Sequence, residues 1–162
     1  MSNHHTERAK EILEKIIYAT VATADKNGKP WNSPVRHVYD SDLNLYWFSD
    51  KSNQHSQNIR ENEDVLIVIY DSTVPEGQGE GVYIEAKAKQ VEDPEEIRKA
   101  RQIKKGRNND APNDFMDGAI RRVYKATPTR VWVNDAEVKD GIFLRDYRVE
   151  IPLPIIQNLL RK

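Results

Sequence analysis

Residues 46–70 place the tightest constraint on how this chain folds. They read as a strand, YWFSDK, then the polar segment SNQHSQNIRENED, then the apolar run VLIVIY. The pattern predicts a helix that begins within residues 52–58, directly after the strand. Such a start gathers free backbone N–H groups and the positive end of the helix dipole, which makes an anion site with phosphate as the expected occupant. The alternative is an ordinary helix start that the Ser52 side chain caps, with the other polar groups in water.

The run VLIVIY at residues 65–70 is apolar on both faces. An antiparallel strand in a small protein normally has one face in water and therefore alternates. The chain offers too few predicted helices to cover a second sheet face. A second copy of the chain is the expected cover, and the pattern therefore predicts a homodimer. The alternative is a strand at the centre of a closed barrel with a helix packed beside it.

Hairpin-connected strands precede this stretch. IYATVATA is rich in β-forming residues, and Asn27-Gly28 is a strong hairpin-turn pair. The returning strand, residues 29–39, carries Pro30 and Pro34, which cannot donate a hydrogen bond to a neighbouring strand. At least part of it is therefore predicted to lie at a sheet edge, a bulge or an opening. A DSD turn leads to LNLYWFS, so the three strands are predicted to form a meander.

The second half of the chain predicts three more strands. A glycine-rich loop, STVPEGQGEG, precedes the strand VYIEAKAKQV. A dinucleotide-binding loop would need a helix there, so the glycines are expected to form a wide turn or a close approach to a ligand. VYKATPTRVWVND reads as a strand interrupted at Pro128, and GIFLRDYRVEI reads as the last strand. The chain is thus predicted to be mainly β, of the α+β class, with six or so strands in a small antiparallel barrel.

Helices are predicted around these strands. Asp93-Pro94 is a helix start, with an aspartate cap and a proline at the first helical position, for a helix that ends near Gly106. The segment PLPIIQNLLRK predicts a short amphipathic helix, and another short helix is expected near Phe115. The opening helix is indicated by apolar residues at helical spacing, namely Ala9, Ile12, Leu13 and Ile16.

Composition narrows the function classes. The 162 residues suffice for one domain, residues 1–162, and the 25 basic and 26 acidic residues create no global field that favours nucleic acid or an anionic membrane. No apolar run approaches the roughly 20 residues of a membrane-spanning helix. MSNHHTERAK contains no apolar signal region, so a cytoplasmic protein is expected. Cysteine is absent, which excludes disulfides, thiolate nucleophiles and cysteine-ligated metal centres.

One basic cluster lies toward the end of the helix predicted from Pro94. A nucleic-acid patch would need interleaved aromatic residues for base stacking, and the cluster has none. We therefore expect a solvated helix face whose cations complement the C-terminal end of the dipole, and no nucleic-acid partner. The members are Arg98, Lys99, Arg101, Lys104, Lys105 and Arg107.

The sequence contains no motif typical of a metal site or of a serine hydrolase. The four histidines, at positions 4, 5, 37 and 55, show neither HxH nor HExxH spacing, and no GxSxG elbow occurs. We therefore expect no metal site. What remains is an anion-binding helix start beside aromatic strands, in a chain without redox-active side chains of its own. A phosphorylated, planar cofactor fits that combination.

With these residues in view, the chain resembles the pyridoxamine 5'-phosphate oxidase-like family of FMN-binding split barrels. The resemblance covers roughly residues 11–151. It rests on ATVATADKNGKPWNSPV, on LYWFSDKSNQHSQNIRENEDVLIVIYD, and on the pairing of GEGVYIEAKAKQVED with a late RVWV strand. It implies a small antiparallel split β-barrel with peripheral helices, a single FMN-binding domain and a homodimer.

The resemblance also implies cofactor-binding residues. In the family, the strand after the first turn flanks the isoalloxazine ring, and a hydroxyl residue, here Ser49, contacts the phosphate. The partner subunit supplies a tryptophan and an arginine, which resemble Trp132 and Arg148 in this chain. The implied set is Ser33, Pro34, Val35, Arg36, His37, Val38, Trp47, Phe48, Ser49, Ser52, Asn53, Gln54, His55, Trp132 and Arg148.

Two segments depart from the family pattern. Where the family commonly has an Arg-Lys pair at the helix start, this chain has Gln54 and His55. Gln54 donates without charge, and His55 is charged only when its pKa is raised, which a bound phosphate dianion favours. The vitamin B6 enzyme carries an Arg-x-His-Asp-Arg-like substrate segment, whereas residues 144–148 read LRDYR. Pyridoxine-phosphate oxidase activity is therefore not expected.

The leading hypothesis is a cytoplasmic, homodimeric FMN protein. It would act as an oxidoreductase that moves hydride or electrons between a nicotinamide donor or substrate and a small organic molecule or oxygen. No residue stands out as an acid or a base, so no catalytic residue is assigned. The alternatives are a non-catalytic module that binds FMN or haem, with His37 or His55 as the axial ligand, and a deazaflavin-dependent reductase.

Overall fold

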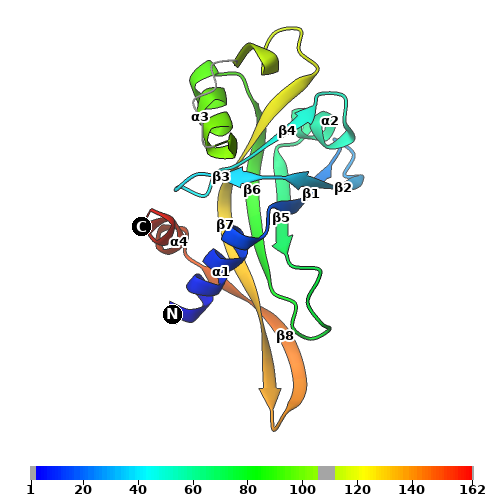
Figure 1. Cartoon of the computed structure of the whole chain (residues 1–162). Helices are drawn as coiled ribbons and strands as arrows, with labels where there is room; N and C mark the ends of the chain where they lie inside the picture. Colours follow the sequence, from blue (N-terminus) through cyan, green and yellow to red (C-terminus); the bar gives the residue numbers. More distant parts are fainter. Residues whose placement is uncertain (1–2, 106–111, 162) are drawn as a thin grey trace.

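The computed structural model describes residues 3–105 and 112–161 (Figure 1). Within these residues, eight antiparallel strands form one sheet in the order β2-β1-β5-β6-β7-β4-β3, with β8 paired to β7. The fold is an open split β-barrel of the α+β class with peripheral helices, as predicted. The strands are β1 (Tyr18–Ala24), β2 (Pro30–Arg36), β3 (Val38–Tyr39), β4 (Leu45–Asp50), β5 (Asp64–Tyr70), β6 (Gly81–Val91), β7 (Arg121–Lys139) and β8 (Ile142–Ile151). The helices are α1 (Asn3–Lys15), α2 (Gln54–Glu61), α3 (Pro94–Lys105), the short 3-10 helix η1 (Pro112–Phe115) and α4 (Leu153–Leu160).

The chain itself connects the two edges of the sheet. β2 lies at one edge, paired with β1, and β3 lies at the other edge, paired with β4. A single residue, His37, joins these two strands. The predicted edge position of the proline-bearing strand is confirmed. The predicted meander is wrong in part, because the chain crosses between the edges at His37 and β4 therefore pairs with β7 instead of β2.

The turn between β1 and β2 follows from its sequence. Gly28 has a φ of +82°, a conformation that residues with a side chain rarely adopt. The Asp25 carboxylate accepts the backbone N–H groups of Asn27 at 2.8 Å and Lys29 at 2.9 Å. The predicted Asn27-Gly28 hairpin is confirmed, and its carboxylate clamp fixes the register that sets Ser33 opposite Val21.

β7 is one continuous strand, contrary to the interruption predicted at Pro128. Its register against β6 shifts from Glu85 opposite Arg130 to Ala86 opposite Pro128. Thr129 is therefore the extra residue of a β-bulge, and its hydroxyl donates to the carbonyl of Glu85 at 3.1 Å. A bulge is one of the few places in a sheet where proline is tolerated, because the local ladder already lacks a bond there.

β5 divides its apolar residues between two faces. Val65, Ile67 and Ile69 are buried in the core, whereas Leu66 is 40% exposed and Tyr70 is 49% exposed. The outer face of the sheet thus carries large apolar side chains toward solvent in one copy of the chain. These two side chains keep this exposure with all the described helices in place. That a second copy covers them stays a prediction.

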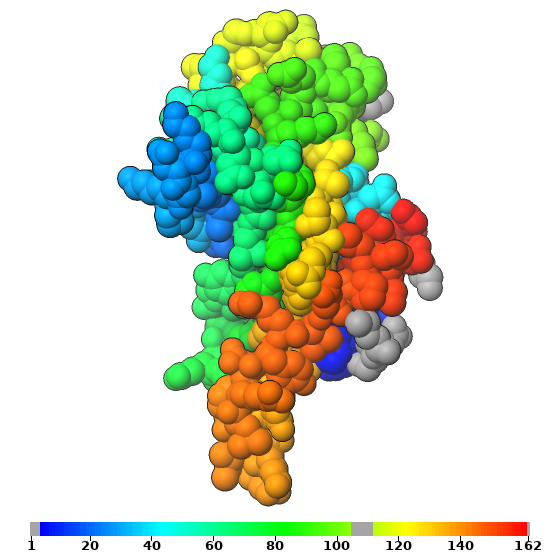
Figure 2. Space-filling model, turned by 180° about the vertical axis from the view of Figure 1, so that it is seen from behind, coloured from blue at the N-terminus to red at the C-terminus, as the bar shows by residue number. Residues whose placement is uncertain are grey.

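The hairpin of β7 and β8 forms an arm that projects beyond the rest of the molecule (Figures 1 and 2). Its turn is Asp140-Gly141, where both residues have positive φ angles of 52° and 77°. Apolar side chains gather near its tip and are more than half exposed: Val138, Ile142, Phe143 and Leu144.

The helices confirm the predictions made for them. α1 buries Ala9, Ile12 and Leu13, and it lies beside α4 (Figure 1). At the start of α3, the Asp93 carboxylate accepts the N–H of Glu95 at 3.2 Å. In the part of the chain that the structure describes, no helix has the length and apolar character to cross a membrane.

The cations of α3 contact groups of the same chain. Lys99 forms an ion pair with the buried Asp40 at 2.6 Å, Arg101 pairs with Asp114 at 3.5 Å, and Arg98 pairs with Glu95. The ammonium of Lys104 lies 4.3 Å from the ring centre of Phe48. The side chain of Lys105, and Arg107 as a whole, lie outside the described residues. These contacts give the described cations structural roles within the fold.

Two tryptophans differ in burial, and their substitution should therefore lower the free energy of unfolding by different amounts. Trp47 is 1% exposed and stacks on Tyr124 with 5.7 Å between ring centres, whereas Trp132 is half-buried on the outer face. Trp47→Ala is expected to lower the free energy of unfolding by roughly 3–5 kcal/mol, the usual cost of emptying a core aromatic site. Trp132→Ala should cost clearly less. Urea unfolding of both variants without added ligand measures the difference, and equal losses would contradict it.

Candidate functional site

The start of α2 is the predicted anion site. The structure places the N-cap at Asn53, one residue after the Ser52 of the sequence alternative, and no side chain caps the first turn. Ser52 instead bonds to Asp50, whose carboxylate accepts its N–H and its hydroxyl, both at 2.7 Å. The first backbone N–H groups of α2 are thus left without a side-chain acceptor, which is what an anion-binding helix start requires.

A polar cluster lies under this helix start, between β2 and β4. The ring of His55 bridges two serine hydroxyls: Nδ1 lies 3.1 Å from Ser33 Oγ and Nε2 lies 2.8 Å from Ser49 Oγ. The side-chain amide of Asn53 donates to Ser49 Oγ at 2.9 Å. We call Ser33, Ser49, Asn53 and His55 the serine–histidine cluster. Three separate elements of the fold therefore bring four of the predicted cofactor-binding residues together.

Further polar residues extend the cluster, and the predicted cofactor-binding set lacks three of them. Gln54 donates to the side-chain oxygen of Asn58 at 2.8 Å, and Asn58 donates to Thr23 Oγ1 at 3.0 Å. Trp31 Nε1 donates to Ser33 Oγ at 3.0 Å. The three are Thr23, Trp31 and Asn58. For Asn58 the sequence offered a signal. The four-residue spacing of Gln54 and Asn58 was the available signal, because it places both on one helix face.

His55 is a neutral group in this setting. It is 5% exposed, and the loss of water around the ring lowers its pKa below the ordinary value of about 6.5. Hydrogen bonds from Ser52 likewise hold the pKa of the Asp50 carboxyl below its usual range. At neutral pH the site therefore offers uncharged donors, with one carboxylate at the turn before the helix.

The other predicted residues of β2 and β3 alternate between the two faces of the sheet. Pro34 and Arg36 are exposed, Val35 is buried in the core, and Val38 is half-buried. His37 is buried, and its Nε2 lies 3.1 Å from the carbonyl oxygen of Ile16. Only Ser33 of this predicted segment reaches the serine–histidine cluster through its side chain.

The predicted aromatic residues occupy other positions. Trp47 lies in the core, and Phe48 packs edge-on against Phe115 at 5.1 Å between ring centres. On the outer face, the guanidinium of Arg130 lies 4.4 Å from the Trp132 ring, and that of Arg148 lies 4.3 Å from the Tyr83 ring. Trp132 and Tyr83 face each other across β6 and β7. Within one copy, they form a surface distinct from the serine–histidine cluster.

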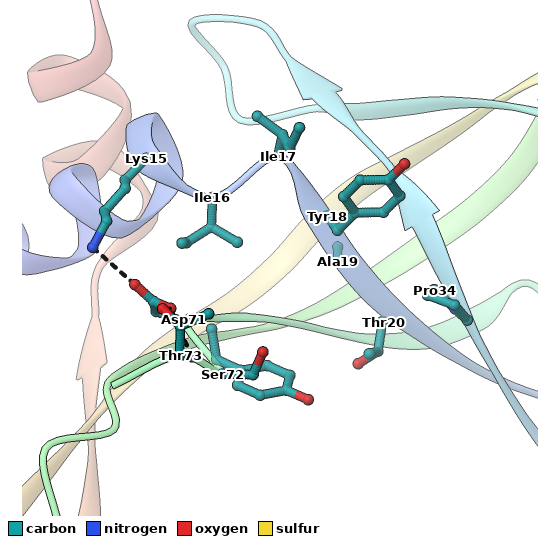
Figure 3. Close-up of a pocket in the computed structure, with 11 residues that line it drawn as sticks. Lys15, Ile16, Ile17, Tyr18, Ala19, Thr20, Pro34, Asp71, Ser72 and Thr73 are labelled. Atoms are coloured by element: carbon teal, nitrogen blue, oxygen red, sulfur yellow. Dashed lines mark hydrogen bonds and ion pairs between the residues drawn. The ribbon is translucent and has the colours of Figure 1, made fainter. Parts of the chain in front are cut away.

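A pocket of about 340 Å³ lies on the outer side of β1 and β2 (Figure 3). Because Ser33 and Pro34 are neighbours in a strand, they point to opposite faces, and Pro34 lines this pocket. Lys15 reaches Asp71 at its rim with an Nζ–Oδ2 distance of 2.8 Å (Figure 3). Hydrogen bonds from Lys15 and Thr73 hold the pKa of Asp71 well below its usual range. The rest of the wall is largely apolar and includes Ile17 and Tyr18.

Three of the four histidines are hydrogen-bonded within the fold. His5 Nε2 lies 2.6 Å from Asp135, His37 bonds to a backbone carbonyl, and both nitrogens of His55 face serine hydroxyls. Among residues 3–105 and 112–161, no group of three or more His, Asp or Glu side chains is arranged to hold a metal ion.

Comparison with known proteins assigns the family. A family model described as pyridoxamine 5'-phosphate oxidase matches residues 5–135. The chain belongs to the pyridoxamine 5'-phosphate oxidase family. This confirms the resemblance seen in the sequence, and the match contains the whole serine–histidine cluster. No curated protein sequence matches the chain significantly.

Solved structures share the fold at low sequence identity. A haem-binding protein from Mycobacterium smegmatis is 18% identical with a TM-score of 0.69, covering 94% of this chain and 60% of its own. The haem storage protein from Vibrio cholerae is 18% identical with a TM-score of 0.62, covering 76% and 90%. General stress protein 26 from Bacillus anthracis is 19% identical with a TM-score of 0.58, covering 86% and 97%. At these identities the likeness shows the fold alone.

The lowered pKa of His55 predicts a pH dependence of stability. An unfolded chain binds the proton near pH 6.5, whereas the folded chain does so only at lower pH. Between the two values the unfolded state holds more protons, so the free energy of unfolding should fall as the pH drops below about 6.5. Each unit between the two pKa values corresponds to about 1.4 kcal/mol.

Urea unfolding at about pH 7.5 and about pH 5.5 measures this loss, to which the buried His37 also contributes because burial lowers its pKa too. His55→Gln should reduce the difference between the two pH values. His4→Gln, at an exposed position, serves as the control and should keep the wild-type difference. An unchanged difference in His55→Gln would contradict a desolvated His55.

Proposed function

We propose that this protein is a cytoplasmic, homodimeric flavoprotein that binds FMN and acts as an oxidoreductase on a small molecule. The observation that carries the proposal is the uncapped start of α2 above the serine–histidine cluster, in a chain of the pyridoxamine 5'-phosphate oxidase family. One domain, residues 1–162, would contain the whole of this site apart from what a second copy adds.

The donor set of the cluster fits a phosphate monoester. The backbone N–H groups of the first turn have no side-chain cap, the Asn53 side-chain amide lies 2.9 Å from Ser49 Oγ, and Gln54 is the next residue along the helix. The positive end of the helix dipole takes the place of the charged pair that the family commonly carries. The fit therefore rests on hydrogen bonds from neutral groups, with Ser49 as the central donor.

FMN, when bound, supplies the transfer of a hydride or of electrons. The residues of this chain would bind its phosphate at the serine–histidine cluster and orient the rest along β2. The pocket beside Pro34 is the space that we propose for the small-molecule substrate or the nicotinamide donor. It opens on the face of β2 opposite the cluster, and because β2 is an edge strand, a cofactor could extend around it from one face to the other. No acid or base of this chain is assigned to the reaction, since His55 is buried between two hydroxyls.

A second copy of the chain is part of the proposal. The outer face of β5 exposes Leu66 and Tyr70, and Tyr83 and Trp132 continue this apolar surface across β6 and β7. Stable homodimer interfaces are large and have an apolar centre, and this surface offers one. It would also bring Trp132 and Arg148 of one copy toward the cofactor of the other, as the resemblance implies.

Haem is less well supported than a flavin. An axial ligand needs an accessible imidazole nitrogen, and in the described residues His37 and His55 are both buried and hydrogen-bonded within the fold. Two of the similar solved structures are a haem-binding protein and a haem storage protein, but at 18% identity the similarity supports only a shared fold.

The proposal predicts that the purified protein takes up FMN and that Ser49 binds its phosphate. Ser49→Ala should weaken FMN binding about ten- to a hundredfold, the usual loss for a hydrogen bond to a charged group, and leave riboflavin binding nearly unchanged. Titration of each flavin, followed by quenching of its fluorescence, gives both affinities. Ser41→Ala, at an exposed turn position, is the matched control.

Three results would go against this assignment. Wild-type protein that leaves FMN fluorescence unchanged would exclude the cofactor. Tighter uptake of a deazaflavin, or a Soret band after addition of haem, would favour the alternatives. If Ser49→Ala weakened FMN and riboflavin binding equally, Ser49 would not be a phosphate ligand. Thermal midpoints without ligand show whether the variant is folded.

The exposed face of β5 predicts the oligomeric state. Light scattering at micromolar concentration should give twice the 18.8 kDa mass of the chain. Leu66→Lys should shift the mass toward that of one chain, because a charge in the centre of an apolar interface loses its water. Ile103→Lys on α3, also at an exposed apolar position, is the control and should remain dimeric. A monomeric wild type would refute the dimer.

A further inference from the structure

His55 joins two serines that belong to different strands. Its Nδ1 lies 3.1 Å from Ser33 Oγ on β2, and its Nε2 lies 2.8 Å from Ser49 Oγ on β4. The ring is buried and neutral at neutral pH, and a neutral imidazole carries a single N–H. One nitrogen therefore donates to its serine, while the other nitrogen accepts the hydrogen of the opposite serine.

Each serine also has a neighbour that can only donate. Trp31 Nε1 donates to Ser33 Oγ at 3.0 Å, and the Asn53 amide nitrogen donates to Ser49 Oγ at 2.9 Å. Neither neighbour can accept a serine hydrogen through these contacts. The serine that donates to His55 thus has no hydrogen left for a ligand, whereas the serine that accepts from His55 keeps its hydrogen free.

We infer that Ser33, His55 and Ser49 form a two-state relay in which only one of the two serines can donate to a bound ligand at a time. When Nε2 carries the hydrogen, Ser49 is free to donate and Ser33 donates to Nδ1. When Nδ1 carries it, the roles of the serines are exchanged. A ligand that accepts from Ser49 therefore selects the Nε2–H tautomer and commits the hydroxyl of Ser33 to His55.

The relay gives this site a preference for a single acceptor group. This step rests on the proposed function, in which the ligand is the phosphate monoester end of FMN at Ser49. A ligand that presents acceptors to both serines would gain one hydroxyl donor and not two. Ser33 becomes a positioning residue for the phosphate: it acts through His55 and does not touch the phosphate.

Nitrogen-15 spectra of the histidine rings in the full-length protein test the relay directly. With FMN bound, His55 should be neutral and carry its hydrogen on Nε2, and riboflavin should leave it as in the free protein. His37 provides an internal control. Its Nε2 faces the Ile16 carbonyl, which can only accept, so that nitrogen must carry hydrogen in every sample.

The outcomes separate the relay from the FMN proposal. Hydrogen on Nδ1 in the FMN complex, or on both nitrogens, would overturn the relay; the second result would mean that the phosphate protonates His55. If FMN fluorescence shows that no FMN binds, the FMN proposal fails. Excess inorganic phosphate then decides the relay, because it should produce the same Nε2–H state, and hydrogen on Nδ1 in that sample would overturn it.

Two substitutions at Ser33 give a second test by flavin titration. Ser33→Ala should weaken FMN binding about three- to tenfold, the usual range for a lost hydrogen bond between neutral groups, and leave riboflavin unchanged. Ser33→Thr retains a hydroxyl and should restore the wild-type affinity. Equal losses of FMN and riboflavin in Ser33→Ala, or no rescue by threonine in a folded variant, would refute the positioning role.

Discussion

The geometry of the barrel depends on how His37 is held. This residue alone joins β2 at one sheet edge to β3 at the other. Its backbone N–H donates to the carbonyl of Ile17 at 3.1 Å, and its ring bonds to the carbonyl of Ile16 at the same distance. These bonds tie the joint to the segment between α1 and β1. The gap between β2 and β4, which His55 spans, is therefore set by the closure of the sheet and not by α2 alone.

Local signals were enough to predict much of the fold. The Asn27-Gly28 turn and the Asp93 cap each depend on backbone chemistry within a few residues, so their sequence is sufficient. Strand pairing was harder, because it joins residues far apart in the chain. Nothing near Pro128 reveals that β6 tolerates a bulge there, and nothing after Tyr39 reveals that β4 lies beside β7.

The candidate site likewise has features that the local sequence predicts and features that depend on long-range packing. The helix start and the polar character of residues 52–58 could be predicted from the sequence, since both are local. The burial of His55 between Ser33 and Ser49 could not, because it arises where β2, β4 and α2 pack together. Burial also changes the chemistry of His55. The sequence suggested a charged histidine that a bound phosphate would favour, whereas the buried ring is a neutral bridge between two serines. Thr23 was missed for the same reason, since its role comes from a contact with Asn58 that is 35 positions away.

The prolines of β2 have a consequence for how copies of this protein can meet. An open sheet edge invites another strand to add to it, and runaway addition of this kind leads to fibres. Two of the seven residues of β2, Pro30 and Pro34, have no N–H to offer such a strand. The edge beside the serine–histidine cluster is thereby a poor template for sheet growth. A partner copy in the proposed dimer would accordingly meet a face of the sheet and not this edge.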